Sequence, residues 1–219
     1  LGEGNMDFAR IEMPPYNAEL GFPEHKQLLE DNLLELLAFT QENYNLVTLS
    51  IESNNKSVHE ASARRLEYVA YLERDIQSYF SRFLAATTDE EESRQLLNLI
   101  TRYDYLHQAH DSIEDLFNTK LTLDRQFIEL RSDVMLMVRE ISSRTLGLFE
   151  AIHRALVAGT KPDVHDRGAE LRDTIDKVNR DLLRLMSDPE RRDVGALSHF
   201  VTYSRRLRDK LVRFSKLSS

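Results

Sequence analysis

Apolar side chains recur every three or four residues along most of this chain. This spacing places them on one face of an α-helix. The first such stretch covers residues 24–52, and its apolar positions are Leu29, Leu33, Leu36, Leu37, Tyr44, Val47 and Ile51. The same period returns in residues 66–83, 96–117, 123–157, 171–185 and 189–217. The pattern therefore predicts six helices and an all-α fold.

Glycine and proline mark where these helices end. Neither residue occurs in 24–146, which favours long helices with short connections. Residues 57–60 (Ser-Val-His-Glu) and 88–91 (Thr-Asp-Glu-Glu) have the form of capping boxes that begin the second and third helices. Gly159 and Pro162 are expected to end the fourth helix, and Asp188 followed by Pro189 to begin the sixth.

The helices divide most simply into two units of three. Residues 1–23 contain several glycines and prolines and are expected to form an irregular leader or linker. The first three-helix unit is predicted at 24–120 and the second at 121–219. Short connections make successive helices antiparallel. We therefore predict six long antiparallel helices arranged as two tandem three-helix bundles.

Composition narrows the classes of function. The net charge is −8 and 30% of the residues are charged, so a nucleic-acid partner, which would require a basic surface, is not expected. The chain has no cysteine, which excludes disulfides and thiolate ligands. No apolar run reaches the length of a membrane span. Because the first residue is Leu1 rather than Met, one expectation is that the chain is a fragment of a longer protein with a membrane segment upstream.

The densest polar segment lies in the third helix. His107, Asp111 and Glu114 are spaced i, i+4, i+7 and so share one helix face. Imidazole and carboxylate groups on one face are possible ligands for a divalent cation such as zinc, manganese or iron, with further ligands from another helix. The alternative is that they form surface ion pairs. Glu73, which interrupts the apolar row of the second helix, either reaches a cation or marks the edge of that row.

Other signs of catalysis are weak. Glu150 and His153 have the Glu-x-x-His spacing of di-iron bundles, but the chain has no second such pair. It also lacks a nucleophile elbow and a glycine-rich phosphate loop. We therefore expect a protein that is not an enzyme. A metal-dependent helical hydrolase or oxidase remains the alternative.

Helix order and local motifs resemble the PhoU family over roughly residues 24–218. In that family the third helix of each half carries a pattern similar to Asp-Leu-Glu-Arg-Ile-Gly-Asp, and residues 105–111 occupy its place here. Asp111 and the later Glu114 agree with the pattern, while His107 stands where the family has Glu.

The second half resembles the family in a similar way. Asp209 agrees with the motif of the sixth helix, but Arg205 replaces its acid. In the fifth helix, Asp176 belongs to a retained acid-x-Ile-Asp-x-Val motif. Asp176 is therefore a candidate ligand, whereas the positive charge of Arg205 argues against a cation beside the sixth helix.

The resemblance implies a function. PhoU-like proteins modulate phosphate uptake and its signalling, and several bind metal clusters through Glu/Asp-x-x-x-Asp motifs. A divergent PhoU-like domain also forms the cytoplasmic tail of bacterial sodium/phosphate cotransporters. The resemblance therefore implies a regulatory domain at the inner face of the cell membrane, whose partner is a membrane phosphate transporter in cis or in trans. A stand-alone PhoU-type regulator and a homodimer are further options.

Overall fold

The computed structural model describes residues 8–218, and six helices account for most of them. They are α1 (Phe22–Ser53), α2 (Lys56–Ala86), α3 (Glu90–Arg125), α4 (Ser132–Val157), α5 (His165–Leu185) and α6 (Arg192–Leu217). Residues 8–218 contain no strand. The predicted all-α class with six long helices is confirmed.

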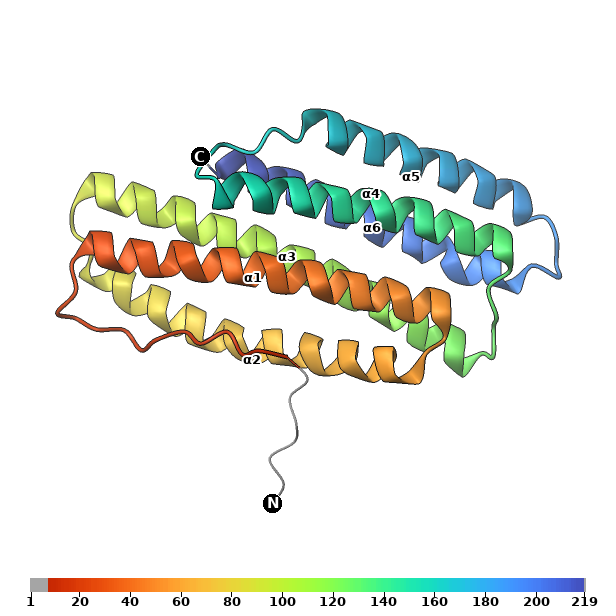
Figure 1. The fold of residues 1–219 in the computed structure, drawn as a ribbon, viewed down its shortest axis with the longest axis horizontal. Helices are drawn as coiled ribbons and strands as arrows, with labels where there is room; N and C mark the ends of the chain where they lie inside the picture. The colour runs from red at the N-terminus through yellow and green to blue at the C-terminus, as the bar shows by residue number, and fades with distance from the viewer. Residues whose placement is uncertain (1–7, 219) are drawn as a thin grey trace, which may run out of the picture.

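Corresponding helices of the two halves pack along each other. In Figure 1, α1 lies beside α4 and α3 lies beside α6, and these pairs form the interior of the molecule. The outer helices are α2, which packs against α1 and α3, and α5, which packs against α4 and α6. Each outer helix thus contacts only helices of its own half within residues 8–218. The division of the chain at 120/121 stays a prediction.

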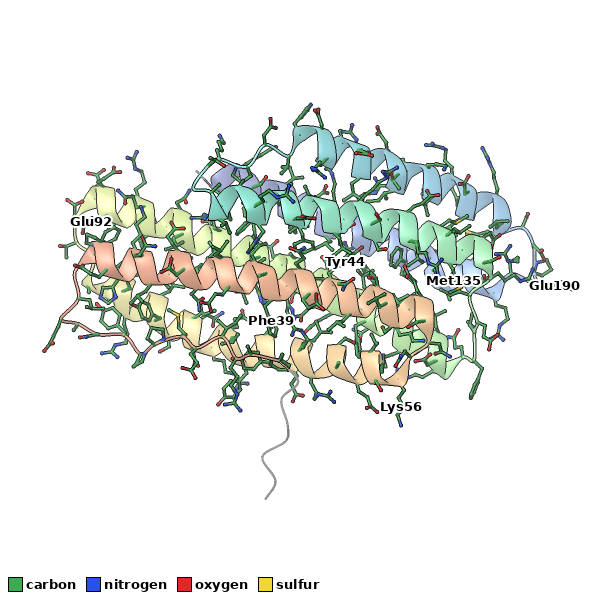
Figure 2. The ribbon with its side chains drawn as sticks, viewed as in Figure 1. Phe39, Tyr44, Lys56, Glu92, Met135 and Glu190 are labelled. Atoms are coloured by element: carbon green, nitrogen blue, oxygen red, sulfur yellow. The ribbon has the colours of Figure 1, made fainter. Side chains whose placement is uncertain are left out.

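The apolar core continues from one half into the other. Tyr44 of α1 and Phe149 of α4 are both completely buried, and their ring centroids lie 5.9 Å apart. Figure 2 places Tyr44 in the middle of the helix bundle, whereas Lys56 and Glu92 lie at helix ends. Burying a large apolar side chain stabilises a fold by about 1.5–3 kcal/mol. The contact between α1 and α4 therefore contributes directly to stability.

The two predicted capping boxes are wrong in their first residue. Asn55, not Ser57, caps α2, because its side chain accepts hydrogen bonds from the amides of residues 57 and 58. Asp89, not Thr88, caps α3 by accepting a hydrogen bond from the amide of Glu92 at 3.0 Å. In each case an Asx residue within two positions of the predicted cap accepts hydrogen bonds from free amides of the first turn.

The fourth helix begins at Ser132, not at Leu123 as predicted. Leu123 is buried as part of α3, which ends in a Schellman motif. In this motif the amide of Ile128 donates to the carbonyl of Leu123 at 2.9 Å, and Phe127 adopts the left-handed conformation with φ of 54°. Glycine usually occupies that position, so a phenylalanine there carries no obvious signal that the helix ends.

The sixth helix also begins later than predicted, at Arg192 rather than at Pro189. Asp188 instead closes a tight turn by accepting a hydrogen bond from the amide of Glu190 at 2.9 Å. By contrast, the predicted end of α4 is confirmed. Gly159 has φ of 69°, and the amide of Thr160 donates to the carbonyl of Ala155.

In the described part of the predicted leader, residues 8–21 contain no helix but pack against α1 and α2, and its last two residues, 22 and 23, belong to α1. The hydroxyl of Tyr68 donates a hydrogen bond to the carbonyl of Ile11 at 2.9 Å. Further along, the ring of Tyr16 stacks on His25 of α1 with 4.6 Å between centroids. Residues 1–7 of the predicted leader lie outside the described part of the chain.

Candidate functional site

His107 lies on α3 and faces α2. Its Nε2 atom is 3.3 Å from Oε1 of Glu73 on α2 and 3.6 Å from Oδ1 of Asp111 on its own helix. The side chains of His107 and Glu73 are each about one-third exposed. Glu73 therefore interrupts the apolar row of α2 because it pairs with an imidazole on the neighbouring helix. We refer to Glu73, His107 and Asp111 as the α2–α3 cluster.

Glu114, the third predicted residue of α3, pairs with a different histidine. Its Oε1 atom lies 3.0 Å from Nε2 of His110, whose side chain is buried. The hydrogen bond from His110 lowers the pKa of the Glu114 carboxyl, and it outweighs partial burial, which acts in the opposite direction. The three residues expected to form one site on α3 are thus separated: Asp111 pairs with His107, and Glu114 pairs with His110.

Asp176 lies on α5, in the other half of the molecule. Its Oδ1 atom is 2.7 Å from Nη1 of Arg205 on α6, and both side chains are about two-fifths exposed. The guanidinium that replaces the acid of the family motif thus supplies the positive charge next to Asp176. A cation at this position would have to displace Arg205.

The described residues do not assemble the predicted metal site. Within residues 8–218, no group of three or more histidine and acidic side chains is arranged to hold a metal ion. In the α2–α3 cluster both carboxylates approach the same imidazole nitrogen, which is the geometry of an ion pair or a shared hydrogen bond. Binding of zinc, manganese or iron by His107 and Asp111 stays a prediction.

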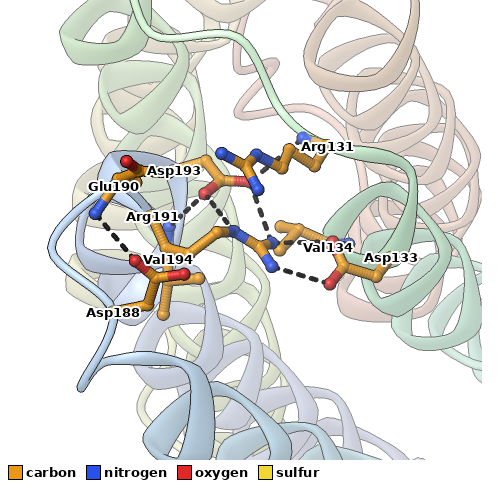
Figure 3. A network of polar contacts seen from close by, with 8 residues as sticks. All are labelled: Arg131, Asp133, Val134, Asp188, Glu190, Arg191, Asp193 and Val194. Atoms are coloured by element: carbon orange, nitrogen blue, oxygen red, sulfur yellow. Dashed lines mark hydrogen bonds and ion pairs between the residues drawn. The ribbon is translucent and has the colours of Figure 1, made fainter.

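A second polar cluster joins the beginnings of α4 and α6, and the sequence pattern did not predict it. Arg191 precedes α6 and is buried, and its guanidinium binds Asp133 of α4 through two hydrogen bonds of 2.7 and 2.9 Å. Arg191 also contacts Asp193, which in turn accepts hydrogen bonds from the amides of Arg131 and Val194. Figure 3 shows this network.

The network perturbs the ionisation of both acids. The hydrogen bond from Arg191 lowers the pKa of Asp133. Burial raises the pKa of Asp193, but the hydrogen bonds from Arg191 and from two backbone amides outweigh burial and lower it. Both carboxylates are therefore held in their charged forms. The network connects two helix starts, and Arg191 binds both of its carboxylates, so we interpret it as structural.

Comparison with known proteins assigns the fold. The sequence matches no protein-family model and no curated protein sequence. A solved structure of PhoU from Pseudomonas aeruginosa is similar with a TM-score of 0.76, over 90% of this chain and 97% of that chain. The chain has the PhoU fold. Sequence identity is 16%, so the likeness shows architecture alone.

The PhoU fold confirms the expected architecture at low sequence identity. Within residues 8–218, every helix lacks the combination of length and apolarity that crossing a membrane requires. The link to sodium/phosphate cotransporters stays a prediction.

Proposed function

We propose that this chain is a non-enzymatic regulatory domain that controls inorganic phosphate uptake by contact with a membrane phosphate transporter. The observation that carries the proposal is the match to a PhoU structure over nearly the full length of both chains. The acid and histidine side chains on the α2–α3 face add to it. Of these, Asp111 agrees with the family motif and His107 stands where the family has Glu, while Glu73 pairs with His107 from the neighbouring helix.

The proposed mechanism is conformational. The pair of Glu73 and His107 links α2 to α3, and the pair of Asp176 and Arg205 links α5 to α6. Each pair thus ties an outer helix to an inner one. Partly exposed pairs contribute only about 0.2–1 kcal/mol, so a competing ion is able to open them at little cost. Phosphate would compete for Arg205, and a divalent cation for Glu73, His107 and Asp111.

We further propose that the chain is the cytoplasmic part of a sodium-dependent phosphate transporter, placed at the inner face of the cell membrane. The alternative is a stand-alone regulator that binds its transporter in trans, alone or as a homodimer. The coding sequence upstream of Leu1 distinguishes the two. Apolar spans in the same reading frame would support the transporter, and an immediate start codon would support the separate regulator.

The functional test is made in cells that carry the gene. Deletion of residues 22–217 is expected to change phosphate uptake when phosphate is abundant. Arg205→Met is expected to have part of that effect, because it removes the partner of Asp176. Arg213→Met, an exposed change on the same helix, serves as the matched control. Uptake and its repression that survive the deletion unaltered would refute the proposal.

A separate measurement tests the predicted cation and the enzymatic alternative. Purified protein is equilibrated with zinc, manganese or iron, and the bound metal is quantified. His107→Ala and Asp111→Ala should each lower the metal content if the α2–α3 cluster binds the ion. Turnover of a phosphoester that disappears in both variants would favour a metal-dependent hydrolase over a regulator.

A further inference from the structure

A cavity of about 160 Å³ lies between α1, α2 and α3, beside the α2–α3 cluster. Its walls are mainly apolar and buried, and they include Leu36, Val69, Leu72, Ile76, Phe80 and Leu106. An apolar cavity of about 150 Å³ is large enough to bind benzene. This cavity therefore has room for one six-membered ring with a small substituent.

His110 lines the cavity and has a buried polar atom without a partner. His110 is 2% exposed, and its Nδ1 atom makes no hydrogen bond. Its Nε2 atom faces the carboxylate of Glu114, which only accepts hydrogen bonds, so Nε2 carries the proton. In the neutral imidazole, Nδ1 is therefore an acceptor with a free lone pair. A buried polar atom left in this state costs stability that a ligand would recover.

The rim of the cavity limits the charge of a ligand. Glu73, Gln77, Asp104 and His107 line it and are the more exposed members of the lining. Gln77 donates a hydrogen bond to Glu73 at 3.1 Å, and Glu73 also contacts His107. The rim side chains are thus engaged with their neighbours, and two of them are carboxylates. Anions are disfavoured at such an entrance.

We propose that this cavity binds a small uncharged molecule with an apolar ring and one O–H or N–H group, which donates a hydrogen bond to Nδ1 of His110. The apolar walls would cover the ring. The ligand would lie between α2 and α3, next to the contact of Glu73 with His107. This proposal is independent of the phosphate function, because it rests on the cavity and on His110 alone.

Phenol is a suitable probe, and toluene, benzoate and benzylamine are its matched comparisons. We expect saturable binding of phenol to the full chain by calorimetry, at least tenfold tighter than binding of benzoate or benzylamine, because the apolar walls cannot replace the water around a charged group. In nitrogen-15 spectra of histidine side chains, the Nδ1 signal of His110 should shift as phenol is added. His110→Leu should weaken phenol about tenfold, because one buried hydrogen bond is lost, and leave toluene unchanged.

A second variant fixes the location. Val69→Phe places a ring in the cavity and should abolish binding of phenol and toluene, whereas Leu183→Phe, on the exposed side of α5, should leave both unchanged. Circular dichroism shows whether Val69→Phe is folded. If it is not, the phenol and toluene affinities of His110→Leu test the proposal without it. Absence of phenol binding, equal binding of benzoate or benzylamine, or an unchanged phenol affinity in His110→Leu would each overturn the proposal.

Discussion

Removing the charge of Arg191 should destabilise the protein more than any change to an exposed arginine. Arg191→Met leaves the apolar stem but removes the guanidinium that binds Asp133 and Asp193. The side chain of Asp193 is 3% exposed and would stay buried without its cation. Breaking a buried ion pair on one side costs about 3–5 kcal/mol.

The structure places the expected loss near the lower end of this range. Asp193 keeps two hydrogen bonds from backbone amides, and Asp133 is 46% exposed, so water replaces part of what it loses. We therefore expect a loss of about 3 kcal/mol. For a chain of this size, that corresponds to a fall in Tm of roughly 6–12 °C.

Denaturant unfolding at pH 7, followed by circular dichroism, measures this loss. Arg184→Met is the control, because Arg184 is 78% exposed and pairs only loosely with Asp181, at 3.7 Å. It should change stability by less than about 0.5 kcal/mol. The interpretation fails if the two variants lose stability to the same extent.

The stability that the same network contributes should depend on pH in the acid range. Asp133 and Asp193 have pKa values below 3.8 in the folded protein, so their contribution is present above pH 3.8 and is lost as pH falls further. The difference between the native protein and Arg191→Met should therefore shrink below that pH. A difference that stays constant down to pH 2.5 would contradict this assignment.

Three further predictions concern single positions. Asn55→Ala should lower the free energy of unfolding by about 1 kcal/mol, since it removes the cap of α2, and Ser57→Ala should lower it by less than about 0.5 kcal/mol. Urea unfolding measures both, and equal losses would indicate that Ser57 is the cap. Burial lowers the pKa of His25 from 6.5, so stability should fall as pH drops below 6.5, by at most about 1.4 kcal/mol per pH unit. His25→Phe should reduce that slope in urea titrations between pH 7 and 5, and an unchanged slope would count against it. Phe127→Gly should stabilise by about 0.5–1 kcal/mol, because Phe127 is 91% exposed and has a left-handed φ; a lower Tm would refute this.

Helix ends show where sequence reasoning succeeds and where it fails. Gly159 and Phe127 hold equivalent positions after α4 and α3, both in the left-handed conformation. Glycine adopts it at no steric cost, so the end of α4 was predictable. Phenylalanine carries no such signal, and the hydrogen bonds of the last turn enforce the same geometry there.

The candidate site was predictable in composition but not in pairing. Helical spacing predicted that His107, Asp111 and Glu114 share one helix face. It did not indicate which side chain each of them pairs with. Glu73 reaches His107 only because α2 and α3 are adjacent in this register. The Arg191 network joins residues 58 positions apart, so no local pattern could indicate it.

The packing of α1 along α4 and of α3 along α6 has a consequence for the history of the chain. A polypeptide with only the first three helices would leave the inner sides of α1 and α3 uncovered. Two copies of it, related by a twofold axis, would cover those surfaces for each other in an isologous dimer. The present molecule has the architecture of such a dimer joined end to end, as duplication and fusion of an ancestral gene would produce.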